Sequence, residues 1–320
     1  MSNNLIWWIK TFIFIVTLYG IYLLVLEKGS KIEDFSEVKN RILIPQKIPL
    51  LILVIALTPI NWAFEALKWQ KLAQKVEKIS FLDAYRGVLV GLTLGSITPF
   101  MLGDYAGKIW MLKSDKRLES IGAIILGNGF QTFVTLIFGA IGYAIFLFLC
   151  KDSLWYFHLF VLCIIVLIII LGVIILLKKE KILGYFNQIK WFARISPYAQ
   201  FLENYNNADL LKILSIAAAR YCVFAVQFVL LLIIFEIKLP IFVLFSGVCL
   251  ILLTKLIALN TLGDLGIRQL TSIYFFGQFQ ISTLVITSAT LLIWLINVLV
   301  PMLIGAIFIW KLKISTKPAN

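Results

Sequence analysis

Charged residues are scarce in this sequence of 320 residues, of which 14% are Asp, Glu, Lys or Arg and 61% are hydrophobic. The mean hydropathy is +0.99, and a water-soluble globule cannot hide so many apolar side chains in its interior. The composition therefore excludes a soluble globular domain and predicts a polytopic membrane protein.

Residues that bind metals or form disulfides are also few. His158 is the single histidine, and the four cysteines, Cys150, Cys163, Cys222 and Cys249, show no CxxC or metal-ligand spacing. The cysteines lie in or beside apolar segments and are expected to pack as small hydrophobic side chains. The sequence also contains no P-loop, so neither a cofactor nor a nucleotide site is predicted.

Long apolar segments predict the membrane spans. A helix needs roughly 20 apolar residues to cross a bilayer, and the longest polar connection, about 178–211, is too short for a separate catalytic domain. We expect a single all-α integral-membrane domain over residues 1–320 with about six full transmembrane helices. The predicted spans are 5–26, 48–68, 120–149, 154–177, 212–235 and 282–310.

Two further apolar regions are interrupted by helix-breaking residues. The first is 81–118, broken at Pro99 and Gly103, and the second is 240–279, broken from Asn260 onward. Their arms are short for a full crossing at about 1.5 Å of rise per residue. We therefore expect two re-entrant hairpins of half-length helices, with two full crossings as the alternative. Such short arms are 104–118 and 267–279.

The net charge of +13 comes from 29 Lys and Arg against 16 Asp and Glu. This charge flanks the membrane spans, so it predicts how the protein is oriented in the membrane. It does not predict nucleic-acid binding. The protein is expected in the plasma membrane, with both termini in the cytoplasm. Connections rich in positive charge, such as 68–86 and 178–212, are also expected in the cytoplasm, whereas 151–152 and 236–238 are expected outside. The segment 27–47 is then also outside, which conflicts with its five Lys and Arg residues.

This assignment gives the two hairpins opposite orientations, because the first enters from the cytoplasm and the second from the exterior. Two approximately inverted halves are predicted, 48–149 and 212–310, with 1–26 and 154–177 as additional spans. Inverted repeats whose broken helices meet near the bilayer midplane are the recurring architecture of secondary transporters. Irregular backbone at that depth is tolerated inside protein or beside water, so both breaks are expected to face one cleft.

A short charged motif occurs in both interrupted regions. Leu-Gly-Asp-Tyr-Ala-Gly-Lys at 102–108 returns as Leu-Gly-Asp-Leu-Gly-Ile-Arg at 262–268. The acid and the cation are four residues apart and share a helix face, and ionisable residues at membrane depth mark functional sites. The predicted substrate-binding residues are Pro99, Gly103, Asp104, Lys108, Asn260, Gly263, Asp264 and Arg268.

The residue types at the breaks favour an anionic ligand. Pro99 ends a helix, Gly103 supplies backbone freedom, and Asp104 is suited to cap a helix beginning at Tyr105. The second break, from Asn260, offers similar chemistry. A helix that begins there directs its N–H groups and positive dipole end into the cleft, where a phosphate binds favourably.

Two interpretations of the charged pairs remain open. In the functional one, Lys108 and Arg268 engage a lipid phosphate, while Asp104 and Asp264 orient them, bind a cationic headgroup or carry a proton. In the other, the pairs are caps and local ion pairs that only allow a broken helix to exist. The recurrence of the motif in both halves favours the functional interpretation.

Polar side chains on the flanking spans are secondary candidates. Lys68 is expected instead to be an interfacial anchor, and Arg220 to extend toward the cytoplasmic boundary. Asn128 and Gln131 either contact substrate or hydrogen-bond between helices. The secondary candidates are Glu65, Lys68, Asn128, Gln131 and Arg220, and the tryptophans predicted to lie in membrane-surface belts are Trp7, Trp8, Trp62, Trp69, Trp191 and Trp310.

Three stretches carry a family resemblance: 65–69, 95–108 and 263–269. Together they resemble the lysylphosphatidylglycerol synthase transmembrane-region family, a flippase-like family, over nearly the whole chain. The resemblance implies a membrane protein that moves or handles polar lipids. The namesake synthases carry a further soluble aminoacyltransferase domain that nothing here resembles, so lipid translocation is implied more than aminoacyl transfer.

The motifs also depart from the family pattern. Lys108 occupies the position of an arginine that follows Pro and Gly-Asp in the family, and lysine offers a point charge where arginine binds phosphate bidentately. At the second motif the family often has Pro and Gly-x-Arg-Glu, whereas this chain has Asn260 and ends in Arg268-Gln269. The missing Pro and Glu bear on the substrate and on any acid-dependent step.

Three functions compete at this point. The leading hypothesis is a flippase-like protein that translocates or handles polar lipids, with anionic or aminoacylated phospholipid or a polyprenyl carrier as substrate. The second is an intramembrane lipid-modifying enzyme that uses the same acids for acid–base catalysis, although no nucleophile motif supports it. The third is a scaffold that recruits a partner synthase through the basic 178–212 loop.

Overall fold

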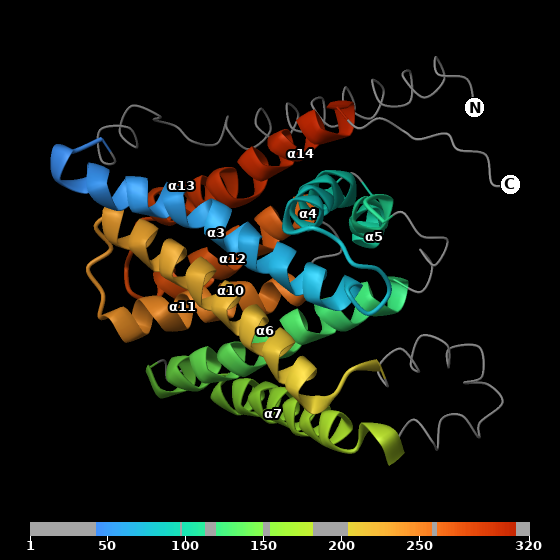
Figure 1. Cartoon of the computed structure of the whole chain (residues 1–320). Helices are drawn as coiled ribbons and strands as arrows, with labels where there is room; N and C mark the ends of the chain where they lie inside the picture. Colours follow the sequence, from blue (N-terminus) through green and yellow to red (C-terminus); the bar gives the residue numbers. More distant parts are fainter. Residues whose placement is uncertain are drawn as a thin grey trace, which may run out of the picture.

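The computed structural model describes residues 43–96, 98–112, 120–149, 154–181, 204–257 and 261–311, and every regular element in these ranges is a helix. The predicted all-α polytopic membrane fold is confirmed (Figure 1). Five described helices are long and apolar enough to cross a membrane and match five of the predicted spans: Pro45–Ala73, Ser120–Leu149, Trp155–Leu177, Asn207–Ile234 and Thr283–Trp310. The sixth predicted span, 5–26, lies outside the described residues.

Shorter helices and turns connect these spans. In chain order the elements are η1 (Pro45–Lys47), α3 (Ile48–Ala73), α4 (Phe81–Ser96), η2 (Pro99–Met101), α5 (Leu102–Trp110), α6 (Ser120–Leu149), α7 (Trp155–Leu177), α10 (Asn207–Ile234), α11 (Ile241–Thr254), η6 (Lys255–Ile257), α12 (Thr261–Gly277), α13 (Thr283–Trp294), η7 (Leu295–Leu299) and α14 (Val300–Lys311). The first three η elements are 3₁₀ turns, whereas η7 is a π-helical turn.

Helices α3 and α10 pack against each other and run in opposite directions (Figure 1). At one end Lys47 Nζ lies 2.8 Å from Glu236 Oε1. At the other end Lys75 Nζ lies 3.0 Å from Asp209 Oδ2. Opposite directions are what inverted halves require, and the division of the chain into such halves stays a prediction.

The first interrupted region forms two short helices that pack closely together, α4 and α5. They contain 16 and 9 residues, which corresponds to about 24 Å and about 14 Å at 1.5 Å per residue, below the roughly 30 Å of a bilayer core. Figure 1 shows them side by side, and α4 also packs against α3 and α14.

The turn between α4 and α5 differs from the prediction. Phe100 and Met101 adopt the left-handed conformation, with φ of 53° and 56°. Helix α5 therefore begins at Leu102, with Met101 at its N-cap and no side-chain cap. The prediction that Asp104 caps a helix beginning at Tyr105 is wrong, since Asp104 already lies in the first turn of α5.

Gly103 allows two helices to pack closely. The prediction that it supplies backbone freedom at the break is wrong. No described glycine has a positive φ. A Cβ atom added to Gly103 would lie 2.1 Å from the carbonyl carbon of Leu94, and one added to Gly107 would lie 2.2 Å from the backbone nitrogen of Gly91. These contacts are far shorter than any van der Waals separation, so glycine at both positions lets α5 approach the backbone of α4.

The second interrupted region contains longer helices than predicted. Helix α11 continues into η6 over 17 residues, Ile241–Ile257. Helix α12 also has 17 residues and begins at Thr261, whereas the predicted arm begins at residue 267. Each is about 25 Å long, so this pair approaches the thickness of a bilayer core more closely than α4 and α5 do.

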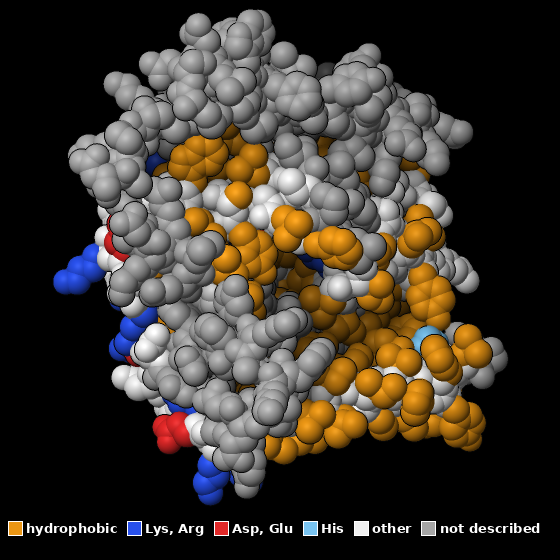
Figure 2. All heavy atoms as spheres, turned by 90° about the vertical axis from the view of Figure 1, so that its right-hand side faces the viewer, with side chains coloured by type: hydrophobic (Ala, Val, Ile, Leu, Met, Phe, Trp, Pro, Cys, Tyr) orange, Lys and Arg blue, Asp and Glu red, His pale blue; other side chains and the backbone are white. Residues whose placement is uncertain are grey.

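The surface of the molecule is suited to lipid. Helix α7 packs on α6 and buries a single residue, Ile165, while most of its long apolar side chains are exposed. Figure 2 shows hydrophobic side chains over much of the described part of one face, with most of the visible Lys and Arg side chains along one margin. Such a separation of apolar and basic surface is typical of a bilayer-embedded protein.

Candidate functional site

A buried carboxylate joins three helices inside the bundle. Glu65 of α3 accepts three cations: Lys68 Nζ lies 2.7 Å from Oε2, Lys108 Nζ lies 3.1 Å from Oε1, and Arg220 Nη1 lies 2.8 Å from Oε2. Lys108 is also 2.9 Å from Asp104 Oδ2. We call these five residues the Glu65 cluster. They come from α3, α5 and α10, so the cluster connects the short hairpin to two spans.

Two neighbouring side chains fix the Glu65 cluster further. Gln131 Oε1 on α6 accepts hydrogen bonds from Lys68 Nζ at 3.4 Å and from Arg220 Nη1 at 3.3 Å. The guanidinium of Arg220 lies over the ring of Trp62, 5.2 Å from its centroid. A cation above an aromatic face is attracted by the ring quadrupole, so Arg220 is held from both sides.

The second motif builds a separate group of charges. On α12, Arg268 Nη2 lies 2.5 Å from Asp264 Oδ2, and both side chains are only 1% exposed. Lys255 of η6 lies 3.3 Å from the same oxygen and is itself exposed. We call these three residues the Asp264 cluster. Arg268 also lies over the ring of Phe224, 5.6 Å from its centroid.

Several polar atoms of the Asp264 cluster have no hydrogen-bond partner among the described residues. They are Nε and Nη1 of Arg268 and Oδ1 of Asp264. Buried polar groups are normally paired, and an unpaired one costs about 1–3 kcal/mol, or more when it is charged. The guanidinium therefore retains donors for a further acceptor.

Helix α10 lies between the two clusters. It contributes Arg220 to the Glu65 cluster, and Phe224, one turn later, lies against Arg268 of the Asp264 cluster. Both clusters therefore adjoin the same helix, and the shared cleft stays a prediction.

A network of neutral polar groups lies beside the Glu65 cluster. Gln227 Nε2 donates to the carbonyl oxygen of Val54 at 2.7 Å, and Asn297 Nδ2 donates to Gln227 Oε1 at 3.1 Å. The carbonyl of Asn297, within the π-helical turn η7, accepts from Trp62 Nε1 at 3.0 Å. Trp62 thus joins this network to Arg220, and the network ties α3 to α10 and η7.

The structure pairs the four charged residues of the repeated motif within each copy of the motif and leaves the two pairs in separate clusters. Asp104 pairs with Lys108 and Asp264 with Arg268, as their spacing predicts. Other motif residues are backbone positions or undescribed: Pro99 lies in η2 and Gly103 in α5, Gly263 lies in the first turn of α12, and Asn260 lies outside the described residues.

Some secondary assignments are corrected. Lys68 is not an interfacial anchor, because it is buried against Glu65. Arg220 does not extend to the boundary but pairs with the same carboxylate. Gln131 makes the predicted interhelical hydrogen bonds, while Asn128 is half-buried on α6. Trp62 and Trp69 are buried and not belt residues, Trp310 is exposed, and Trp7, Trp8 and Trp191 lie outside the described residues.

Sequence reasoning missed three contributors, Lys255, Asn61 and Asn297. Asn61 Nδ2 donates to Asn297 Oδ1 at 3.3 Å inside the neutral network. A single cation within the apolar run 241–257 is a visible signal for Lys255, because such residues are rare in membrane segments. Among the described residues, no group of three or more His, Cys, Asp or Glu is placed to hold a metal ion.

The helices and the clusters together define a polytopic membrane protein with ionic groups buried between its spans. The family model for the lysylphosphatidylglycerol synthase TM region matches residues 7–305, so the chain belongs to this family. The resemblance inferred from the motifs is thereby confirmed, and with it a relation to lipid synthesis or flipping. A search of curated proteins finds no match to the sequence.

Proposed function

We propose that this protein translocates phospholipids with a phosphate-bearing headgroup across the bilayer of the plasma membrane, and that the Glu65 and Asp264 clusters receive that headgroup. The observation that supports the proposal is the net positive charge of each cluster. The Glu65 cluster has three cations for two acids, and the Asp264 cluster has two cations for one acid.

An excess positive charge inside a membrane protein is costly unless an anion completes it. A lipid phosphate is an anion that the surrounding membrane supplies. The unpaired Nε and Nη1 atoms of Arg268 offer donors that suit its oxygens. In the Glu65 cluster, Asp104 keeps 14% of its side chain exposed and supplies a carboxylate for the amine of an aminoacylated headgroup.

Translocation requires the helices around the clusters to separate. Arg268 and Lys108 are buried, so a headgroup reaches them only when α12 or α5 moves away from its neighbours. Lys255 and Arg220 are the more exposed members of each cluster and therefore meet the headgroup first. Because both clusters adjoin α10, a headgroup released by one is received by the other without crossing hydrocarbon.

A leaflet-exchange assay tests the proposal. The purified protein is reconstituted into liposomes with fluorescent phosphatidylglycerol, lysylated phosphatidylglycerol or phosphatidylcholine, and exchange is followed by dithionite quenching. We expect faster exchange than in protein-free vesicles for these phosphate-bearing lipids, and the largest increase for phosphatidylglycerol, because its net negative charge completes the excess positive charge of the clusters. Arg268→Gln and Lys108→Gln are expected to lose it, because each removes a cation from a cluster, while Arg268→Lys retains part of it.

Matched variants separate a local role from a general loss of charge. Arg86→Gln removes an exposed cation that pairs with Asp83 outside both clusters, and we expect wild-type exchange from it. Asp104→Asn and Asp264→Asn remove the acids and are expected to slow release of the phosphate. If folded wild-type protein moves no lipid, or if Arg86→Gln abolishes exchange as completely as Arg268→Gln, the proposal is wrong.

A further inference from the structure

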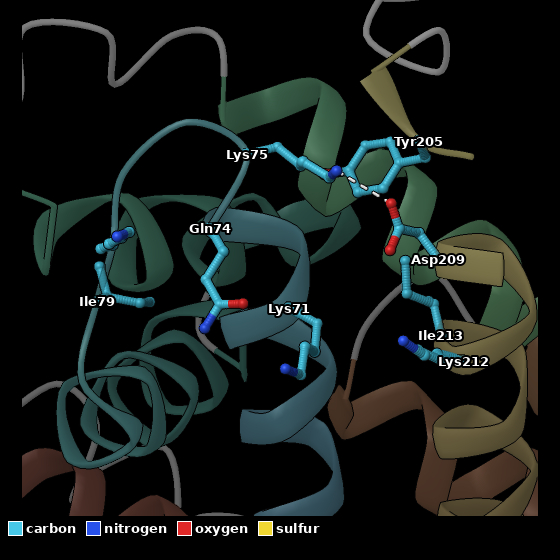
Figure 3. A pocket seen from close by; sticks show the side chains of 9 residues that line it. Lys71, Gln74, Lys75, Ile79, Tyr205, Asp209, Lys212 and Ile213 are labelled. Carbon is cyan, nitrogen blue, oxygen red and sulfur yellow. Dashed lines mark ion pairs between the residues drawn. The ribbon is translucent and has the colours of Figure 1, made fainter.

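A basic pocket opens at the end of the bundle where α3 ends and α10 begins. It has a volume of about 570 Å³ and is lined by Lys71, Lys75, Lys78 and Lys212, among other residues. Figure 3 shows side chains of α3 and α10 on its two sides. A volume of this order is typical of sites for small molecules, which range from about 300 to 1,000 Å³.

The charges lining the pocket are strongly unbalanced. Asp209 is the single acid among the lining residues, and it is already paired with Lys75 at 3.0 Å. Lys71, Lys78 and Lys212 form no ion pair with any described residue. Within the part of the chain that the structure describes, three of the four lining lysines therefore have no acid within ion-pair distance.

Lys212 enters the pocket from the opposite helix to Lys71. It lies in the second turn of α10, which begins at Asn207, and the N-terminal end of a helix carries a partial positive charge. Asp209, in the first turn of the same helix, is the nearest acid along the chain, and it is already paired with Lys75. Lys71 lies in the last turn of α3 and Lys75 just after it. The lysines of the pocket therefore come from the C-terminal end of α3 and the N-terminal part of α10.

One wall of the pocket is held by a buried hydrogen bond. The hydroxyl of Tyr205 donates to the carbonyl oxygen of Leu72 at 2.7 Å, and Lys75 Nζ lies 5.6 Å from the centroid of the Tyr205 ring. Burial, followed by the charge of Asp209, raises the pKa of Tyr205 above its ordinary value. The phenol thus stays protonated and keeps its donor, which fixes the distance between α3 and the segment leading into α10.

From these observations we propose that the pocket binds a small phosphate-bearing anion, either the headgroup of a phosphomonoester lipid or a free phosphate compound. Lys71 and Lys212 hold the anion from the two helices, and Lys78 completes the charge. The inference does not rest on the proposed translocation, because the pocket contains no member of the Glu65 or Asp264 cluster and its binding is measured without transport. Lys71 lies one helical turn beyond Lys68 of the Glu65 cluster, so the pocket adjoins the buried charges.

Two binding measurements distinguish the sources of the phosphate. In the first, protein in phosphatidylcholine nanodiscs is titrated with inorganic pyrophosphate by isothermal titration calorimetry. In the second, protein from nanodiscs of phosphatidylcholine with a minor fraction of phosphatidic acid is examined by native mass spectrometry for retained phosphatidic acid. Signal in the first measurement alone identifies free anions as ligands, signal in the second alone identifies the lipid headgroup, and either result supports the site.

Matched variants decide whether the pocket is responsible. We expect the double substitution Lys71→Gln with Lys212→Gln to weaken binding about tenfold or more, since it removes two charge-assisted contacts. The double substitution Lys178→Gln with Lys238→Gln removes the same charge from exposed positions outside the pocket and is expected to change binding less than twofold. Asp209→Asn is expected to tighten binding, because it frees Lys75. Equal weakening by both double variants, or no binding in either measurement, overturns the proposal.

Discussion

At the scale of single residues, Glu65 is the side chain on which the buried charges depend. Its carboxylate is the common partner of Lys68, Lys108 and Arg220. Removing one member of a buried ion pair leaves the others uncompensated in a medium of low polarity, whereas an exposed pair is stabilised little by its partner. The contribution of Glu65 to stability therefore exceeds that of any exposed acid on the same protein.

We predict that Glu65→Gln destabilises the protein by about 3–5 kcal/mol, the cost of breaking a buried ion pair. The amide retains the shape and one acceptor but no charge for three neighbouring cations. The measurement is the midpoint of thermal unfolding in detergent, followed by tryptophan fluorescence. The midpoint is expected to fall well below that of the wild type.

Asp83→Asn is the control for this prediction. Asp83 pairs with Arg86 at 3.5 Å on the surface, where both side chains are largely exposed. Loss of an exposed pair is expected to cost no more than about 1 kcal/mol. A midpoint for Glu65→Gln as high as that for Asp83→Asn would show that the three cations do not need the carboxylate.

Local spacing explains which of these contacts could be predicted from the sequence. Asp104 with Lys108 and Asp264 with Arg268 are four residues apart, so helix geometry alone brings them together. Lys108 and Glu65 are separated by 43 residues, and no periodicity in the sequence encodes their contact. For the same reason the sequence reveals Lys68 and Arg220 as membrane cations but does not identify Glu65 as their shared partner.

At the scale of elements, the short hairpin depends on glycine packing between α4 and α5. Hydrophobic length correctly predicts a pair of short helices in this region, and Pro99 correctly predicts an interruption. The backbone conformation of the turn is not predictable from residue type, because Phe100 and Met101 adopt a positive φ that such residues rarely take. The tight contact with α4 fixes that conformation, and it forms only in the folded protein.

We predict that Gly103→Ala destabilises this hairpin by about 1–3 kcal/mol or more, the usual cost of overpacking. The added methyl group would lie 2.1 Å from the carbonyl carbon of Leu94, which is backbone and cannot rotate away. Helix α5 must therefore shift relative to α4, and Lys108 shifts with it. Thermal unfolding in detergent measures the loss, and lipid exchange is expected to fall in the same variant.

Gly129→Ala tests whether the effect comes from packing or from glycine in general. Gly129 lies on α6, and a Cβ atom added there meets nothing within 4 Å. Alanine is the better helix former by about 1 kcal/mol, so this substitution is expected to leave the protein unchanged or slightly more stable. Destabilisation by both substitutions would contradict the packing explanation.

At the scale of the whole molecule, the ends of α3 and α10 define two faces of opposite character. One end has the pair Lys47–Glu236. The other has the pair Lys75–Asp209 and the unpaired lysines of the basic pocket. Positive charge favours the cytoplasmic side, so the pocket is expected to face the cytoplasm and Glu236 the exterior.

The structure describes one cation of the segment that conflicts with this orientation. The segment 27–47 carries five Lys and Arg residues, yet the topology places it outside. Lys47 is neutralised there by Glu236 at 2.8 Å, so at least this cation is compensated by an acid from another connection. The positive-inside rule counts cations along the chain, so it does not include Glu236, which is 189 positions away from Lys47 in the sequence.

We predict that a cysteine at position 238 is accessible from outside the cell and that one at position 78 is not. In a background in which Cys150, Cys163, Cys222 and Cys249 are replaced by serine or alanine, Lys238→Cys is expected to react with a membrane-impermeant maleimide in intact cells. Lys78→Cys is expected to react only after the membrane is permeabilised, since it lies at the opposite end of α3 and α10, in the positively charged region. The cysteine-free parent supplies the background signal. The reverse pattern would place the basic pocket outside and would show that the 27–47 cations, and not those of the pocket, set the orientation of the protein.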